Sequence, residues 1–119
     1  MAHRGDDFGT SGYVPEQGDV VHLNWQPSVG SEMKGPHYGL VVSQTLFNQG
    51  TGLVMVCPIT SKGGKVSNFE LAVRAGRVNG VAVLSQMRTL DYMSRSVAYE
   101  DKSSVETAQE ASRRIQMIF

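Results

Sequence analysis

The apolar residues of this chain occur in short runs that glycine and proline interrupt, and helical periodicity is confined to the C-terminal end. Val21, Leu23 and Trp25 alternate with more polar residues, as in a strand with one buried face. Further strands are predicted at 38–43, 53–59, 69–73, 81–84 and 87–91. Short strands separated by turns favour a small, strongly bent antiparallel barrel of the mainly β or α+β class.

Local signals mark the boundaries of two predicted elements. Asn79-Gly80 is a strong turn signal between the fourth and fifth predicted strands. From Val105 to Ile118, apolar residues recur at spacings of three and four, which predicts an amphipathic helix. Ser103, with Glu106 three residues later, has the spacing of a capping box. One helix at the end of a strand-rich chain must pack on the sheet or on a partner.

Length and charge limit the class of protein. The 119 residues suit one domain, and we predict a flexible polar tail over 1–12 followed by a single domain over 13–119. Lysine plus arginine (11) balances aspartate plus glutamate (11), so any nucleic acid would bind a local basic patch, not the overall field. No apolar stretch approaches the roughly 18 residues of a membrane span, and no signal-peptide pattern opens the chain. We therefore expect a cytoplasmic protein.

The cysteine and histidine content argues against disulfides and metals. The single cysteine, Cys57, excludes an internal disulfide and lies in an apolar run, where a small buried hydrophobe is favoured over a reactive thiol. His3, His22 and His37 have no ligand-like spacing with Cys57, so we expect neither a metal nor a cofactor. His22 falls on the polar side of the first predicted strand, as a surface or hydrogen-bonded structural residue.

Two positions could carry chemistry. His37 ends a glycine- and proline-containing loop and directly precedes a core strand, so a rigid element could hold it at the edge of a cleft. Imidazole suits proton transfer near neutral pH, although this position is equally compatible with a structural role. Thr60 and Ser61 follow a strand end, where their hydroxyls could hold a phosphate with Lys62 or cap a turn.

The order and spacing of many short segments add a resemblance to a known family. The segments are 13–15, 18–19, 27–32, 40–43, 47–48, 56–61, 79–81, 86–91 and 94–95. Together they resemble the MazF/PemK toxins, including Kid and ChpB, of bacterial type II toxin–antitoxin systems. The resemblance runs from about Tyr13 to Phe119.

The resemblance implies an SH3-like small antiparallel barrel with a C-terminal helix (the CcdB/PemK-like fold), a homodimer and an acidic antitoxin partner. It also implies sequence-specific, metal-independent cleavage of single-stranded RNA. In that reaction the ribose 2′-hydroxyl attacks the adjacent phosphate, leaving a 2′,3′-cyclic phosphate and a 5′-hydroxyl. Such chemistry needs a base, an acid and donors for the developing charge, and it needs unstacked bases.

The resemblance also assigns site residues, with one departure. Family members usually carry a catalytic Arg-Pro pair where this chain has His37-Tyr38, whereas the partner threonine is kept as Thr60. An arginine–aspartate pair of some members falls on Val83 and Ser85 here. We therefore predict His37 and Thr60 as catalytic, and the RNA-binding residues as Trp25, Glu32, Ser61, Lys62, Lys65, Gln86, Arg88 and Arg95. The alternative is a non-catalytic or decayed toxin fold that binds a protein partner, as CcdB inhibits gyrase.

Overall fold

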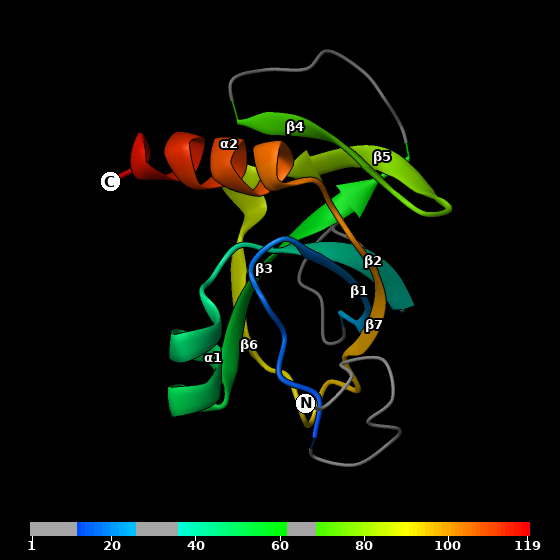
Figure 1. The fold of residues 1–119 in the computed structure, drawn as a ribbon, viewed down its shortest axis with the longest axis vertical. Helices are drawn as coiled ribbons and strands as arrows, with labels where there is room; N and C mark the ends of the chain where they lie inside the picture. Colours follow the sequence, from blue (N-terminus) through cyan, green and yellow to red (C-terminus); the bar gives the residue numbers. More distant parts are fainter. Residues whose placement is uncertain (1–11, 26–35, 62–68) are drawn as a thin grey trace.

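The computed structural model describes residues 12–25, 36–61 and 69–119. Within these ranges the chain forms a curled antiparallel sheet with a helix at its C-terminal end (Figure 1). The elements are β1 (Asp19–Asn24), β2 (Pro36–Val41), α1 (Thr45–Thr51), β3 (Leu53–Thr60), β4 (Glu70–Ala75), β5 (Val78–Val83), the 3-10 turn η2 (Leu84–Gln86), β6 (Arg88–Asp91), β7 (Ala98–Lys102) and α2 (Val105–Gln116). The expected small α+β barrel with a terminal helix is confirmed.

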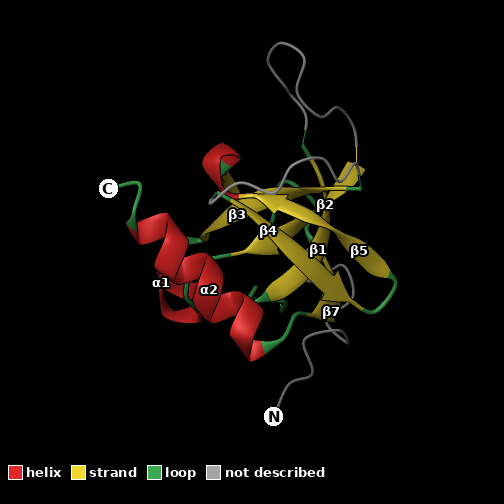
Figure 2. Ribbon diagram, turned by 90° about the horizontal axis from the view of Figure 1, so that it is seen from above, coloured by secondary structure: helices red, strands yellow, loops and turns green. Residues whose placement is uncertain are grey.

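Strand β3 is the centre of the sheet, whose order is β4-β5-β3-β2-β1-β7 with β6 also beside β3. One edge of β3 pairs with β2, with Leu40 opposite Cys57. The early part of β3 pairs with β6, and its last two residues pair with β5. Because β3 pairs with three neighbouring strands, the sheet bends around it. Helix α2 packs on the side of the sheet where β4 lies (Figure 2).

The sheet is buried on both faces. Val20 and Leu40, at 0% exposure, pack in one cluster with Ala111 of α2, whereas Val21 and Val41 belong to a second cluster on the opposite face. Successive strand residues point to opposite faces, which explains why near-continuous apolar runs are needed here. Cys57 lies in the first cluster, where burial raises its pKa to about 12, and the expectation of a buried structural thiol is confirmed.

Two local expectations were wrong. The hairpin between β4 and β5 turns at Gly76, which has φ +58, whereas Asn79 and Gly80 lie inside β5. Gly80 is needed there because a Cβ would lie 2.5 Å from the carbonyl oxygen of Thr60 on β3. The predicted helix cap is also displaced, by one residue.

Ser104, not Ser103, caps α2. The Ser104 hydroxyl accepts a hydrogen bond from Thr107 N at 3.0 Å. Ser103 is instead buried, and its hydroxyl donates to the carbonyl oxygen of Gly18 at 2.7 Å. Ser103, which the capping-box spacing had assigned to the start of the helix, is therefore used in a tertiary contact with Gly18 instead.

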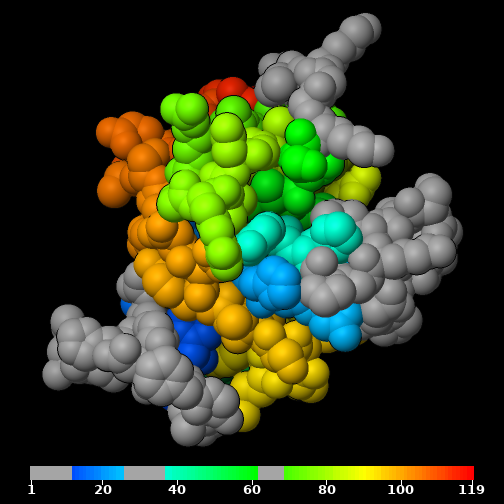
Figure 3. Space-filling model, turned by 90° about the vertical axis from the view of Figure 1, so that its right-hand side faces the viewer, coloured from blue at the N-terminus to red at the C-terminus, as the bar shows by residue number. Residues whose placement is uncertain are grey.

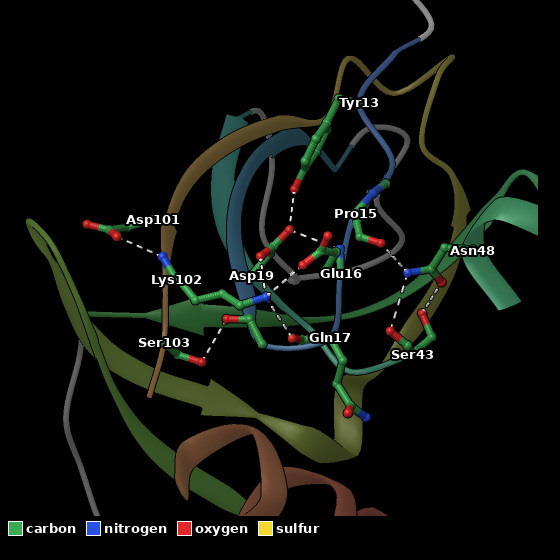
Figure 4. Close-up of polar contacts among 11 residues, drawn as sticks. Tyr13, Pro15, Glu16, Gln17, Asp19, Ser43, Asn48, Asp101, Lys102 and Ser103 are labelled. Atoms are coloured by element: carbon green, nitrogen blue, oxygen red, sulfur yellow. Dashed lines mark hydrogen bonds and ion pairs between the residues drawn. The ribbon is translucent and has the colours of Figure 1, made fainter. Parts of the chain in front are cut away.

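A buried carboxylate organises the start of the domain (Figure 4). Asp19 is 0% exposed and accepts hydrogen bonds from Tyr13 Oη at 2.8 Å, Glu16 N at 2.9 Å and Lys102 Nζ at 2.9 Å. Lys102 also reaches Glu16 Oε1 at 3.4 Å. We call these four residues the Asp19 network; it ties the segment before β1 to the end of β7.

Helix α1 was not expected from the sequence. Its anchor is the fully buried Asn48, whose Nδ2 donates to the carbonyl oxygen of Pro15 at 2.7 Å and whose Oδ1 accepts from Ser43 Oγ at 2.5 Å (Figure 4). The Ser43 hydroxyl in turn accepts from Met55 N at 2.9 Å. These contacts hold a seven-residue helix against β3 that would be too short to form alone.

The β4–β5 hairpin closes the sheet against β7. Arg77 donates to Glu100 at 2.8 Å, and a Cβ at Gly76 would lie 2.1 Å from an Asp101 carboxylate oxygen. Figure 3 shows the light green hairpin lying directly above the cyan and orange surface of β2 and β7. No helix in the described ranges is long and apolar enough to cross a membrane.

Candidate active site

The register of the sheet bears on where the two predicted catalytic residues lie. Gly39 of β2 is paired with Pro58 of β3, and this register, continued by two residues on each strand, would set His37 opposite Thr60. His37 itself is paired with Leu23 of β1, and Thr60 with Val81 of β5. Both residues are half-buried at the ends of their strands. Because Gly39 and Pro58 are opposite each other and side chains alternate along each strand, His37 and Thr60 project from the same face of the sheet. We call this pair of positions the His37–Thr60 edge.

The opposite face of the sheet carries an aromatic pair next to His37. Tyr38 is paired with His22 of β1, and their rings meet edge-to-face with centroids 5.1 Å apart. The half-buried His22 therefore packs on a neighbouring strand, in keeping with its expected structural role. Of the three histidines, His22 and His37 thus lie on adjacent strands but point to opposite faces.

Two predicted cationic residues meet the end of β1. Arg88, the first residue of β6, donates from Nη1 to the carbonyl oxygen of Trp25 at 3.2 Å. The carbonyl oxygen of Arg95 accepts from Asn24 N at 3.4 Å. Within the described ranges, Arg95 Nη1 is buried without a hydrogen-bond partner. Both arginines thus attach beside the last residues of β1, and both side chains are only half-buried.

Trp25 lies in the core. Its side chain is 1% exposed and packs with Val21, Leu23 and Val56. In this conformation the indole offers no open face on which a base could stack. Its contact with the site runs through Arg88, whose Cζ lies 5.9 Å from the ring centroid.

The remaining predicted residues divide into two groups. Ser61, directly after β3, and Gln86, at the end of η2, are exposed. Glu32, Lys62 and Lys65 lie outside the described residues. Gly39 was not predicted as a site residue, yet a Cβ there would lie 3.0 Å from Trp25 Cζ2 and 2.5 Å from Val56 Cγ2. A glycine inside a predicted core strand was the signal for such a close approach.

The donor set supports acid–base chemistry. The described part of the chain contains no group of three or more His, Cys, Asp or Glu residues that could hold a metal ion. The predicted site residues that are described supply an imidazole, a threonine hydroxyl, an exposed serine and two half-buried arginines. Imidazole can transfer protons, and guanidinium pairs well with phosphate oxygens.

The family is decided by comparison with known proteins. Residues 16–119 match the family model described as PemK-like, MazF-like toxin of type II toxin-antitoxin system. The chain belongs to this toxin family. Among curated relatives, the endoribonuclease toxin ChpB of Escherichia coli K12 is 32% identical, covering 87% of this chain and 92% of its own. The endoribonuclease toxin MazF of the same strain is 27% identical, covering 91% and 96%.

A solved structure supports the same assignment at the level of the fold. MazF from Deinococcus radiodurans superimposes with a TM-score of 0.79 at 33% identity, covering 89% of this chain and 96% of that one. The resemblance to MazF/PemK toxins and the CcdB/PemK-like architecture expected from the sequence are therefore confirmed.

Proposed function

We propose that this toxin-family chain is an endoribonuclease that cleaves single-stranded RNA, with His37 and Thr60 at the reacting phosphate. The supporting names are those of the relatives, ChpB and MazF, both described as endoribonuclease toxins. The observation that supports the proposal for this chain is the β2–β3 register, in which Gly39 pairs with Pro58 and which would set His37 opposite Thr60 two residues further on. An imidazole at the place of the family arginine can lose a proton where a guanidinium cannot.

The proposed reaction forms the O2′–P bond and breaks the P–O5′ bond of the same phosphodiester. His37 takes up the proton of the attacking 2′-hydroxyl, and the leaving 5′-oxygen is protonated from solvent. The Thr60 hydroxyl donates to a phosphate oxygen as negative charge develops there. Ser61, Gln86, Arg88 and Arg95 hold the neighbouring nucleotides, as do Lys62, Lys65 and Glu32. The products are a 2′,3′-cyclic phosphate and a 5′-hydroxyl, and no metal takes part.

The proposal extends to partners and location. The family description pairs each toxin with an antitoxin, and we propose an acidic one that binds over the basic residues. A homodimer would cover apolar side chains at the C-terminal end, where Met117, Ile118 and Phe119 are 51%, 44% and 87% exposed. We propose that residues 13–119 form the toxin domain, that 1–12 are a tail, and that the protein works in the cytoplasm.

The test is cleavage of a long RNA by the purified protein in EDTA. We expect discrete fragments that end in a 2′,3′-cyclic phosphate and begin with a 5′-hydroxyl, identified by mass spectrometry. Cleavage that requires Mg²⁺, or fragments with 5′-phosphates, would contradict the mechanism. Inactivity of the wild type on varied RNAs, together with cutting by His37→Arg, would instead identify a decayed toxin fold that acts by binding.

A further inference from the structure

The contact between Trp25 and Arg88 links the core of the sheet to its basic side. Arg88 Nη1 donates to the Trp25 carbonyl oxygen at 3.2 Å, and the guanidinium carbon lies 5.9 Å from the indole centroid. A guanidinium at this distance from a tryptophan ring is attracted by the electrons of the ring face. Trp25 therefore holds the Arg88 guanidinium through both the Trp25 backbone carbonyl and the indole ring.

The indole is itself held in one place. It is 1% exposed, and Gly39 of β2 lies against it so closely that a Cβ would approach Trp25 Cζ2 to 3.0 Å. The same Cβ would lie 2.5 Å from Val56 Cγ2, and Val56 is paired with Arg88 across β3 and β6. Gly39, Trp25 and Arg88 thus form a packed series that begins on the strand of the His37–Thr60 edge.

We infer that Trp25 is a positioning residue that presents the Arg88 guanidinium to the phosphodiester backbone of single-stranded RNA. The inference rests on the proposed function and revises the expected role of Trp25 as a direct RNA contact. A free arginine side chain has many rotamers, and ordering it on binding costs free energy. Contact with a rigid, buried indole orders the guanidinium before the RNA arrives.

The sheet geometry separates this role from catalysis. Arg88 is paired with Val56, which lies four residues from Thr60 along β3. At the usual rise of a strand this is roughly 13 Å, so Arg88 contacts a nucleotide beside the reacting one. Loss of its orientation should therefore weaken substrate binding, and the loss of kcat/KM in RNA cleavage should arise in KM.

The deciding measurement is the salt dependence of binding to an end-labelled, mixed-sequence single-stranded DNA. DNA lacks the 2′-hydroxyl and cannot be cut by the proposed reaction, so binding is measured independently of cleavage. One lost phosphate contact lowers the slope of log affinity against log salt by about 0.7 for a single strand. Trp25 is uncharged, so Trp25→Leu can change this slope only through a cation that it holds.

We expect Arg88→Ala and Trp25→Leu each to weaken DNA binding by roughly tenfold and to lower the salt slope alike. In the Arg88→Ala background, Trp25→Leu should have no further effect, because the two residues act as one unit. Trp25→Phe keeps an aromatic ring and the carbonyl, and should restore most of the affinity. Val54→Ala, a 0% exposed core change, is the control for general destabilisation and should leave the slope unchanged.

Other outcomes overturn the inference. If Trp25→Leu weakens binding equally with and without Arg88 and the slope stays constant, Trp25 stacks on a base. If Arg88→Ala binds normally, Arg88 is not presented to the backbone at all. If Trp25→Leu does not fold, Trp25→Met, which also removes the ring, decides the same question in both backgrounds. A wild type that binds with this coupling but cuts no RNA rejects the proposed cleavage and leaves the positioning role standing.

Discussion

The Asp19 network and the His37–Thr60 edge are both polar groupings in an apolar sheet, yet they differ in burial. Asp19 is 0% exposed and has three hydrogen-bond donors around its carboxylate. His37 and Thr60 are half-buried, at strand ends beside the exposed Ser61. A buried carboxylate surrounded by donors stabilises the fold and has no access to a substrate, whereas a half-open strand end can meet one. Substitutions should therefore separate stability from activity.

The largest effect is expected at the His37–Thr60 edge. His37→Ala should lower the rate of RNA cleavage by roughly a hundred- to ten-thousand-fold, as loss of one acid–base group does. A fluorogenic RNA assay measures the rate, and circular dichroism checks the fold. His22→Ala is the matched control, because His22 is also half-buried but its ring packs on Tyr38 on the opposite face. Near-wild-type cleavage by His37→Ala would reject the histidine mechanism; Thr60→Ala should lose less.

The reverse pattern is expected in the Asp19 network. Asp19→Asn keeps the shape of the side chain but removes the negative charge to which Lys102 and two other donors hydrogen-bond. It should lower the free energy of unfolding by about 2 to 3 kcal/mol. Cleavage per folded molecule should be preserved. Urea unfolding measures the change, and Glu16→Gln is the control because Glu16 meets the same lysine at 3.4 Å and is 36% exposed. Equal losses in both variants would show that burial of Asp19 is not decisive.

A smaller effect distinguishes two adjacent serines at the border of the network. Ser104→Ala removes the acceptor for Thr107 N and should cost about 1 kcal/mol of stability, with frayed helix α2. Ser103→Ala instead removes the hydroxyl bond to Gly18 O, keeps the bond from Ser103 N to the same oxygen, and should leave the helix start capped. Hydrogen exchange at Thr107 separates the two. Faster exchange only in Ser103→Ala would restore the original capping-box assignment.

The smallest effect concerns an exposed ion pair, in contrast to the buried one. Hydrogen bonds from Arg113 and Arg114 lower the pKa of Glu110 to about 2. A lowered folded-state pKa contributes stability above the ordinary glutamate pKa of 4.5, and this is lost as pH falls towards 2. The stability difference between wild type and Glu110→Gln should therefore be small at pH 7, shrink below about pH 4.5, and weaken in high salt. A difference that grows in acid would have the wrong sign.

The sequence predicted an element correctly where the spacing of its apolar residues matched the face that is buried. Alternation predicted β1 with Trp25 on its buried side, and the indole is 1% exposed. Helix α1 was missed because its seven residues include Gly50 and depend on Asn48 contacts with Pro15. Strand β7 was missed because its sequence, Ala98–Lys102, is mostly polar and gains its place by pairing with β1.

The candidate site shows the same limit. Residue types and resemblance could nominate His37 and Thr60, but their sequence separation carries no information on the register of β2 and β3. Register depends on how both faces of the sheet are filled, which is a property of the whole core. The turn at Gly76 was misplaced for this reason, since the tight approach of Gly80 to Thr60 keeps Asn79-Gly80 inside β5.

The burial of Cys57 has a practical consequence for labelling. The chain has one cysteine, and burial at 0% exposure raises its pKa to about 12, so the thiol stays protonated at pH 7. Maleimides and spin-label reagents react with an accessible thiolate, so we expect them not to label Cys57 in the folded wild type. A cysteine introduced at the exposed Gln86 would then carry a fluorophore or spin label at a single position, without prior removal of the native thiol.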